Sequence, residues 1–290
     1  MITHPEKILF PEDGITKGDL AAYYEATAPM ILPHLRRRPV TMERYPSGIG
    51  EKGFWQKDVS RGFPAWLQRV KIPKKNGWVH YPLITDVRSL LWVTNQNTIT
   101  QHVWVSRTPR LLYPDLCVFD LDPSSDDVEA VRRTALALRD FLQQLGLQSW
   151  VKTSGSKGFH IVVPIDGKTA VEDVASFANE AGTMFVRRSP DLLTQEFSKA
   201  DRKGRIYVDT GRNGYGATFA AAYTVRAKPG APVSAPCGWD ELERGDVTPW
   251  TFTLRTMPAR VAQVGDLWAD MLRRGRSLRL PLERLRKLTS

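Results

Sequence analysis

The strongest constraint on the fold is a short apolar run that ends in two acids, LCVFDLDPSSDD at residues 116–127. Its apolar residues predict a buried strand, and the side-chain period of two then directs Asp120 and Asp122 to one face, about 7 Å apart. Carboxylates this close repel each other unless a cation lies between them. A strand that simply ends in a solvated Asp-Pro turn fits residues 123–125 equally well. The run alone therefore leaves a metal site and a plain turn open.

Helical and strand patterns alternate after this run. Apolar residues recur at steps of three, four and seven over 128–145, which predicts a helix followed by Gly146. A second helix is predicted over 170–188, before Ser189-Pro190. Strands are predicted at 149–154, 158–165 and 204–209. Mixed strands with interposed helices indicate an α+β fold class.

The remaining segments predict shorter elements. A helix is predicted over 16–35, with a break near Pro29. Residues 38–84 fit short strands and loops punctuated by Gly and Pro, and residues 86–107 fit a helix followed by a strand. The basic residues of 272–290 predict a surface helix or arm. No internal repeat or low-complexity linker interrupts this pattern.

The charge balance points to a polyanionic partner. The chain has 41 basic and 31 acidic residues, a net charge of +10, which favours nucleic acid over a generically basic protein. Basic and aromatic residues are interleaved over 52–81, as in proteins that stack unpaired bases in a cationic groove, although each ring could also serve the core. No apolar run approaches the roughly 20 residues that cross a bilayer, so no membrane partner is expected. Only Cys117 and Cys237 are present, which disfavours structural zinc and a disulfide framework and favours the cytoplasm.

Two further motifs carry groups suited to phosphate chemistry. Asp209 ends the predicted strand IYVD, as Asp120 and Asp122 end theirs, and three such carboxylates could hold a pair of hard divalent cations. The turn KTSGSKGFH carries Lys157 and His160 among small residues whose backbone amides could approach phosphate oxygens. It lacks the spacing of a Walker loop, and an ordinary structural hairpin remains the alternative.

Taken together, these motifs resemble the catalytic motifs of the archaeo-eukaryotic primase superfamily. More closely, THPEKILFPEDGITKGDL, DLDPS, KTSGSKGFHIVVPI and VDTGRN resemble the polymerase domain of bacterial end-joining ligase D and stand-alone primase-polymerases of mycobacterial type. The likeness runs from Thr3 to about Leu242. It implies an RRM-like catalytic core with mixed sheets flanked by helices, and an N-terminal α/β module packed against it. One domain, 1–290, would comprise a DNA-contacting module (1–110), a catalytic core (111–245) and a C-terminal extension (246–290).

The resemblance also implies roles for individual residues. Asp120, Asp122 and Asp209 would be catalytic and would hold two Mn²⁺ or Mg²⁺ ions. The incoming nucleotide would be bound by Ser154, Lys157, His160, His102, Arg226 and Arg212. DNA would be contacted by Phe54 and Trp55, which stack on the template, and by Lys7 and Lys17, which bind a downstream 5′-phosphate with His4 nearby.

The sequence departs from that family in one place. Glu43 stands where relatives often carry a lysine that serves the 5′-phosphate, so this part of the site is expected to be weakened or rearranged. No ligase Lys-x-Asp-Gly motif and no His-rich phosphoesterase module is present. A stand-alone protein and a domain of a longer one both fit.

The expected function is template-dependent addition of nucleotides, with a preference for ribonucleotides, to primer 3′-ends at short gaps or double-strand breaks. The expected partners are gapped or broken DNA, nucleoside triphosphates, Ku and a separate DNA ligase, and the protein is expected to be a cytoplasmic, nucleoid-associated monomer. A primase that starts chains without a primer is an alternative. A catalytically silent module that binds DNA ends is another.

Overall fold

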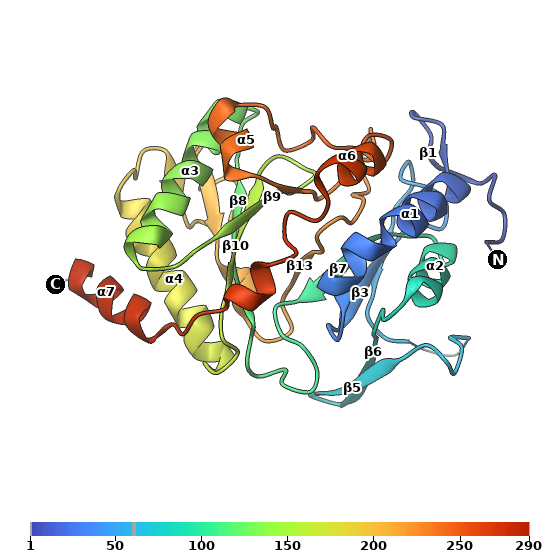
Figure 1. Ribbon diagram of the computed structural model, residues 1–290, viewed down its shortest axis with the longest axis horizontal. Coiled ribbons are helices and arrows are strands. Elements are labelled where there is room, and N and C mark those ends of the chain that lie inside the picture. Colours follow the sequence, from blue (N-terminus) through green and yellow to red (C-terminus); the bar gives the residue numbers. More distant parts are fainter. Residues whose placement is uncertain (1, 60–61, 290) are drawn as a thin grey trace. The chain divides into compact units, whose positions relative to one another are not determined.

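The computed structural model describes residues 2–59 and 62–289, which form two compact units. Unit 1 combines the chain up to Thr108 with residues 218–235 and 252–266, and unit 2 combines residues 109–217, 236–251 and 267 onward. Figure 1 shows the elements of both units. In the part of the chain that the structure describes, no helix has the length and hydropathy needed to cross a bilayer.

Unit 2 is built on a six-stranded sheet. Its strand order is β11-β12-β8-β10-β9-β14, with every pair antiparallel except β11 and β12. The strands are β8 (Leu116–Asp122), β9 (Trp150–Thr153), β10 (Phe159–Pro164), β11 (Leu193–Thr194), β12 (Ile206–Asp209) and β14 (Pro236–Cys237). The helices are α3 (Val128–Gln144), α4 (Val171–Arg187), α5 (Trp239–Arg244) and α7 (Arg279–Thr289), with short 3₁₀ turns η1 (Gly211–Asn213) and η2 (Met271–Arg274).

The apolar pattern explains how this sheet is covered. Residues Leu116 to Phe119 of β8 are at most 3% exposed, because the sheet centre is buried. Helix α3 packs its fully buried apolar stripe against β10, as its period of three and four predicts. Asp127 caps its start by accepting a hydrogen bond from the Ala130 amide at 2.9 Å. Gly146 follows its end with φ of +86°, a conformation that favours glycine.

Unit 1 contains a four-stranded sheet of order β13-β7-β3-β4, all antiparallel, and two separate hairpins. The sheet strands are β3 (Val40–Arg44), β4 (Phe54–Gln56), β7 (Thr98–Trp104) and β13 (Thr218–Ala220). The hairpins are β1 (Ile8–Phe10) with β2 (Ile15–Thr16), and β5 (Arg69–Lys74) with β6 (Gly77–Pro82). The helices are α1 (Lys17–Leu35), α2 (Val87–Asn95) and α6 (Met257–Val264).

The predicted break of the first helix near Pro29 is wrong, because α1 runs unbroken from Lys17 to Leu35 with Pro29 and Pro33 inside it. A proline within a helix costs about 3 kcal/mol. Buried apolar residues on both sides of Pro29, among them Tyr24 and Ile31, pack into the core and offset that cost. Tertiary packing therefore overrides the local signal in α1.

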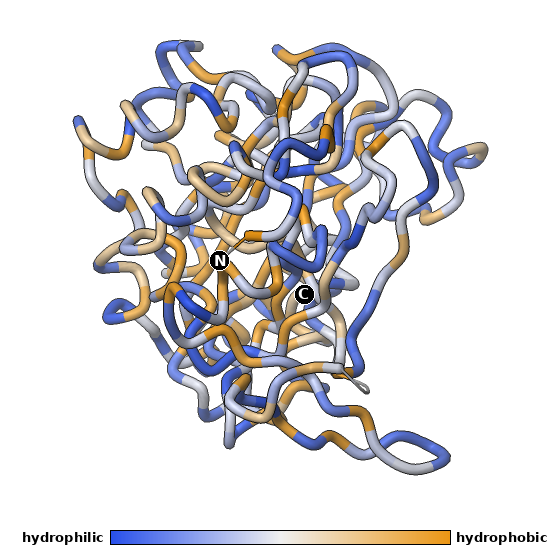
Figure 2. Tube along the Cα trace, turned by 90° about the vertical axis from the view of Figure 1, so that its right-hand side faces the viewer, coloured by the Kyte–Doolittle hydropathy of each residue, from blue (hydrophilic) through white to orange (hydrophobic). Residues whose placement is uncertain are grey.

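Figure 2 shows hydrophobic stretches recurring along the strands and helices, whereas several loops are hydrophilic.

Candidate active site

Two acids from distant parts of the sequence lie directly opposite each other in unit 2. The antiparallel pairing of β12 with β8 places Asp209 opposite Asp120, and Tyr207 opposite Asp122. Cross-strand neighbours have Cβ atoms roughly 5 Å apart, so the side chains of Asp120 and Asp209 are within reach of a common partner. Asp122 follows two residues along the same strand, at the end of β8. Asp120 and Asp209 are therefore cross-strand neighbours, and Asp122 lies on the same face of β8, two residues further along.

Two arginines balance these carboxylates. Arg212, on the turn after β12, lies 3.0 Å from Asp209 (Nη2 to Oδ2) and 3.4 Å from Asp120 (Nε to Oδ2). Arg202 Nη1 lies 2.8 Å from Asp122 Oδ2. With the acids held in this way, no three His, Cys, Asp or Glu side chains within residues 2–59 and 62–289 are arranged as a metal cage. The donor set itself, carboxylate oxygens only, is of the kind that Mg²⁺ and Mn²⁺ prefer.

The environment pushes the pKa values of the two facing acids in opposite directions. Burial alone would raise the pKa of Asp120, but His160, Arg212 and Lys152 together lower it well below its ordinary value. Burial raises the pKa of Asp209, and the charge of Asp120 adds to the rise while Arg212 opposes it. Asp120 is therefore firmly ionised, whereas Asp209 takes up a proton more readily than a free aspartate does.

A buried lysine stands behind His160. His160 and Lys152 face each other across the β10–β9 hairpin, and Lys152 Nζ lies 2.6 Å from His160 Nδ1. The other ring nitrogen, Nε2, lies 3.4 Å from Asp120 Oδ1. A lysine ammonium has only donors, so it donates to Nδ1 and leaves the ring proton on Nε2, on the side of the acids. Lys152 is fully buried and His160 is 3% exposed.

The turn between β9 and β10 is organised around one hydroxyl. Ser154 Oγ accepts hydrogen bonds from the amides of Ser156 and Gly158, each at 3.1 Å. A side chain at Gly158 would place its Cβ 1.7 Å from the Leu121 carbonyl oxygen, so only glycine lets the turn lie against β8. Lys157 is half exposed and pairs with Asp126 at 2.7 Å. The turn thus carries a buried hydroxyl and an exposed ammonium beside the strand that bears Asp120.

A second polar group lies on the four-stranded sheet of unit 1. Glu43 accepts a hydrogen bond from His102 Nε2 at 3.1 Å through one carboxylate oxygen, and from the Tyr45 hydroxyl at 2.9 Å through the other. Burial alone would raise the pKa of Glu43, but the hydrogen bond and charge of His102, the charge of Arg226 and the bond from Tyr45 lower it to about 2. The Trp55 ring packs on His102 with centroids 4.2 Å apart. Glu43 is therefore engaged with two residues predicted to bind nucleotide, His102 and Arg226.

The adjacent aromatics of β4 have different surroundings. Phe54 is 44% exposed and Trp55 is 57% exposed, so neither ring belongs to the core. Successive residues of a strand point to opposite faces, and the contacts agree with this rule. Trp55 packs on His102, whereas the Arg44 guanidinium lies 5.2 Å from the Phe54 ring centroid.

The three residues predicted near a 5′-phosphate are at the start of unit 1. Lys17 is 3% exposed, and its Nζ donates to the Asn95 carbonyl oxygen at 3.2 Å. Burial and the nearby charge of Lys7 lower the pKa of Lys17, so the two ammonium groups are neighbours. Lys7 itself is half-buried. His4 lies exposed, 3.5 Å from Glu6.

Three residues of these groups had no predicted role: Lys152, Arg202 and Tyr45. A signal for Lys152 exists in the sequence, because a hairpin centred on Ser156 pairs position 152 with 160. Arg202 reaches Asp122 from a loop 80 residues away, and no local pattern reports such a contact. Tyr45 follows Glu43 by two residues, which becomes informative only once His102, opposite Thr41 on the neighbouring strand, is known to contact Glu43.

Comparison with known proteins places this geometry in context. A model of the LigD primase-polymerase domain family matches residues 16–268. A solved structure, the polymerase domain from Mycobacterium tuberculosis ligase D in complex with DNA, superposes with a TM-score of 0.88 at 29% identity, covering 95% of this chain and 98% of that one.

Curated relatives extend the comparison. The multifunctional non-homologous end joining protein LigD of Mycolicibacterium smegmatis is 31% identical over 93% of this chain, and that of Pseudomonas aeruginosa is 33% identical over 93%. The bifunctional protein of Bacillus subtilis is 29% identical over 93%. The chain spans between 32% and 44% of the length of these relatives.

Proposed function

Because the chain belongs to the LigD primase-polymerase domain family, we propose that it is a template-dependent nucleotidyltransferase that extends primer 3′-ends at gaps and breaks in DNA. The observation that carries the proposal is the pairing of Asp209 with Asp120 across β12 and β8, with Asp122 two residues further along β8. Strand-end carboxylates from two segments of the chain are what a polymerase of this kind needs to hold divalent ions. The resemblance in motifs and the match in fold support the same function.

In this proposal Asp120, Asp122 and Asp209 hold two Mn²⁺ or Mg²⁺ ions. The chemistry that such ions supply is activation of the primer 3′-hydroxyl and neutralisation of the triphosphate. Arg212 now lies between two of the carboxylates, where its guanidinium provides the positive charge. With cations on those carboxylates, the guanidinium would be available to the triphosphate, which it could bind through two parallel hydrogen bonds.

The turn after β9 supplies the rest of the proposed nucleotide site in unit 2. Ser154 and Lys157 offer a hydroxyl and an ammonium, and His160 presents its Nε2 proton toward the acids. These donors would offset negative charge on the leaving pyrophosphate.

In unit 1, His102 and Arg226 are proposed to bind the nucleotide, and Phe54 and Trp55 to stack on template bases. Exposed aromatic rings next to cations are typical of surfaces that bind unpaired bases. Lys7 and Lys17 are proposed to bind a downstream 5′-phosphate, with His4 nearby. Glu43 has no place in phosphate binding, because a carboxylate with a pKa of about 2 repels phosphate and is engaged with His102.

The proposal extends to the setting of the reaction. Extension of a primer at a gap leaves a nick, so a separate DNA ligase is the natural partner, and an end-binding protein such as Ku would hold broken ends. Ribonucleoside triphosphates are the proposed preferred substrates, and the nucleoid the proposed location. The relatives carry names of non-homologous end joining proteins, which supports broken ends as the substrate.

Primer extension on gapped duplexes tests the function. Each nucleotide type and each metal is supplied in turn, while gap length and 5′-phosphorylation are varied, and one arm omits the primer to detect primase activity. Metal-dependent extension is expected in the unmutated protein and is expected to vanish in D120N/D122N, with DNA affinity nearly intact. Extension that persists in a clean preparation of that variant refutes the assignment of the acids, and DNA binding without any incorporation identifies a silent end-binding module.

A further inference from the structure

The C-terminal basic segment, residues 271–289, concentrates the charge of the chain. It contains seven of the 41 basic residues and one of the 31 acidic residues, and so supplies six of the ten net positive charges. All seven cations are exposed. They are Arg273, Arg274, Arg276, Arg279, Arg284, Arg286 and Lys287. No residue of this segment belongs to the site described above.

The segment is ordered rather than a loose tail. It comprises η2, the connection 275–278 that carries Arg276, and α7, which buries Pro281 and Leu285 on one face. Helical spacing places Arg279, Arg286 and Lys287 on the opposite, solvent-facing side. Eleven helical residues span about 16 Å, so the cations form an extended row rather than a compact cluster.

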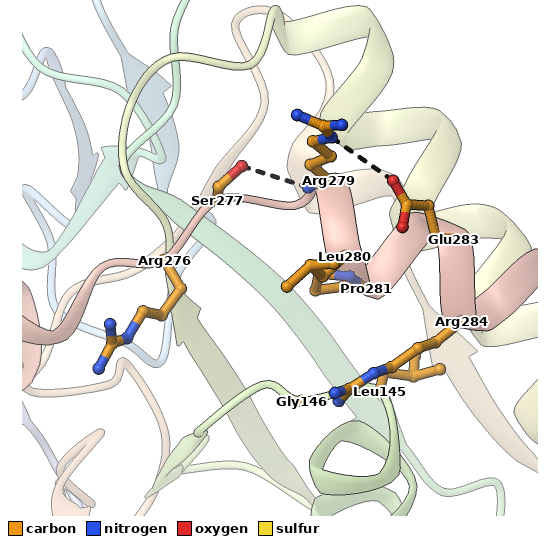
Figure 3. A pocket seen from close by; sticks show the side chains of 9 residues that line it. All are labelled: Leu145, Gly146, Arg276, Ser277, Arg279, Leu280, Pro281, Glu283 and Arg284. Atoms are coloured by element: carbon orange, nitrogen blue, oxygen red, sulfur yellow. Dashed lines mark hydrogen bonds and ion pairs between the residues drawn. The ribbon is translucent and has the colours of Figure 1, made fainter.

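Next to this row is a cavity of about 680 Å³ between α7 and the end of α3. Figure 3 shows Arg276 and Arg279 extending away from each other at its rim, while Arg284 points toward Gly146 and Leu145. Arg279 has one acidic neighbour, Glu283, at 3.5 Å, in an exposed pair of the kind that contributes little. Among the residues that the structure describes, the side chains of Arg274, Arg276 and Arg284 form no ion pair.

We propose that the C-terminal basic segment is a second DNA-contacting surface, which binds the phosphodiester backbone of the duplex that flanks the reacting end. The inference rests on the proposed function, because it takes the substrate to be DNA. Arginine forks bind phosphate oxygens in pairs, and such backbone contacts position a protein on DNA without reading sequence. Each strand of a duplex carries one phosphate per roughly 3.4 Å of helix axis, so cations spread over about 16 Å or more suit a duplex better than they suit a small anion.

Strand β10 gives the distance between this surface and the acids. Arg276 bridges to Ile165, one residue past the end of β10, whereas His160 near the start of β10 pairs with Asp120. Five residues of extended strand separate the two points by roughly 17 Å. DNA that is held at the acids therefore needs an arm of at least about five base pairs to reach the segment.

The test is equilibrium binding of fluorescent gapped duplexes over a range of salt concentrations, which needs no turnover. The variant R274Q/R276Q/R279Q removes three exposed cations of the segment. The control R133Q/K168Q/R244Q removes three exposed cations elsewhere in unit 2. Each lost phosphate contact is expected to reduce the slope of log K against log salt by about 0.9. The slope of the variant should therefore be reduced by the equivalent of about two to three phosphate contacts. The variant should bind long-armed duplexes about tenfold more weakly than the control does. On duplexes with arms shorter than about five base pairs, the variant and the control should bind equally well.

Two results overturn the proposal. One is equal affinity and equal salt slope for the variant and its control on long-armed duplexes. The other is binding of poly-glutamate by the unmutated protein that is lost in the variant, while the affinity for DNA stays unchanged. That result would assign the surface to an acidic protein partner. Failure of the proposed function shows separately, as absent primer extension by the unmutated protein.

Discussion

The Nζ atom of Lys152 lies 2.6 Å from Nδ1 of His160, and both side chains are buried behind Asp120. The charge of Lys152 also lowers the pKa of Asp120, so the lysine acts on the acid as well as on the ring. Because an ammonium only donates, the pair selects the tautomer of His160 that carries its proton on Nε2, toward the acids. Lys152 is thus a positioning residue, which acts on the proposed nucleotide site through His160.

Replacing Lys152 with Met removes the donor but keeps a long apolar side chain. We expect the KM for nucleotide to rise about tenfold or more, the effect of losing one charge-assisted hydrogen bond, with a smaller change in kcat. The ¹⁵N chemical shifts of His160 report its tautomer directly and should change in the variant. The variant should also unfold at a lower temperature, since the buried Nδ1 of His160 loses this donor. An unchanged tautomer together with an unchanged KM would contradict this role.

Arg212 is expected to substitute for cations between Asp120 and Asp209. In R212Q the two carboxylates lose the guanidinium that pairs with both of them, so the metal-free variant should unfold at a lower temperature than the unmutated protein. Mn²⁺ should restore that loss, giving a larger rise in Tm for R212Q than for the unmutated protein. R133Q, an exposed arginine elsewhere on unit 2, is the control. Equal Mn²⁺ shifts in all three proteins would contradict this role of Arg212, and no shift in any of them would count against Mn²⁺ binding at the acids.

Glu43 gives a prediction for pH. Its pKa is lowered from an ordinary 4.5 to about 2, by His102, Arg226 and Tyr45 acting against burial. A lowered pKa means that the stabilisation is fully present above about pH 4.5 and is lost as the pH falls toward 2. The free energy of unfolding of the unmutated protein should exceed that of E43Q by about 1–3 kcal/mol at pH 6, the range for a hydrogen bond to a charged group. Urea unfolding of both proteins at a series of pH values measures the difference, and a gap that stays constant down to pH 3 would rule out this account.

Phe54 and Trp55 are exposed neighbours that allow a matched comparison. Replacing either ring with Ala should weaken binding to gapped DNA by about 1–3 kcal/mol per lost stack. Only W55A should also raise the KM for nucleotide, because Trp55 packs on His102 and Phe54 does not. Fluorescence anisotropy with DNA and steady-state kinetics separate the two effects. Unchanged DNA affinity in both variants would remove the rings from the DNA surface.

Lys7 and Lys17 are predicted to differ although both face a proposed 5′-phosphate. K7A should abolish any preference for a phosphorylated downstream end. It should leave stability unchanged, since the Lys7 side chain is only half-buried, in contrast to that of Lys17. K17A should abolish the preference and also destabilise unit 1, because Lys17 is 3% exposed and bonded to the Asn95 carbonyl. Binding to gapped duplexes with and without the phosphate, together with thermal unfolding, checks both. If K7A keeps the preference, the phosphate is bound elsewhere.

The sequence alone determined much of the local structure in unit 2. The apolar period of α3, the glycine that follows it and the strands on either side of the 154–158 turn lie where the pattern predicts them. It also placed Asp120, Asp122 and Asp209 at strand ends, and the family resemblance is confirmed by the match of residues 16–268. The helix, the strands and the turn depend on neighbours within a few residues, which is the range over which backbone preference and side-chain period act.

Only the tertiary structure decided which groups meet. The strand order β12-β8-β10 places Asp209 opposite Asp120 and His160 on the other side of the same strand, and that order depends on burial across the whole sheet. The contact of Glu43 with His102 joins positions 59 residues apart, and no local pattern in the sequence reports it. The same competition kept α1 continuous through Pro29, because the buried residues on both sides of the proline gain more from the core than the local backbone loses.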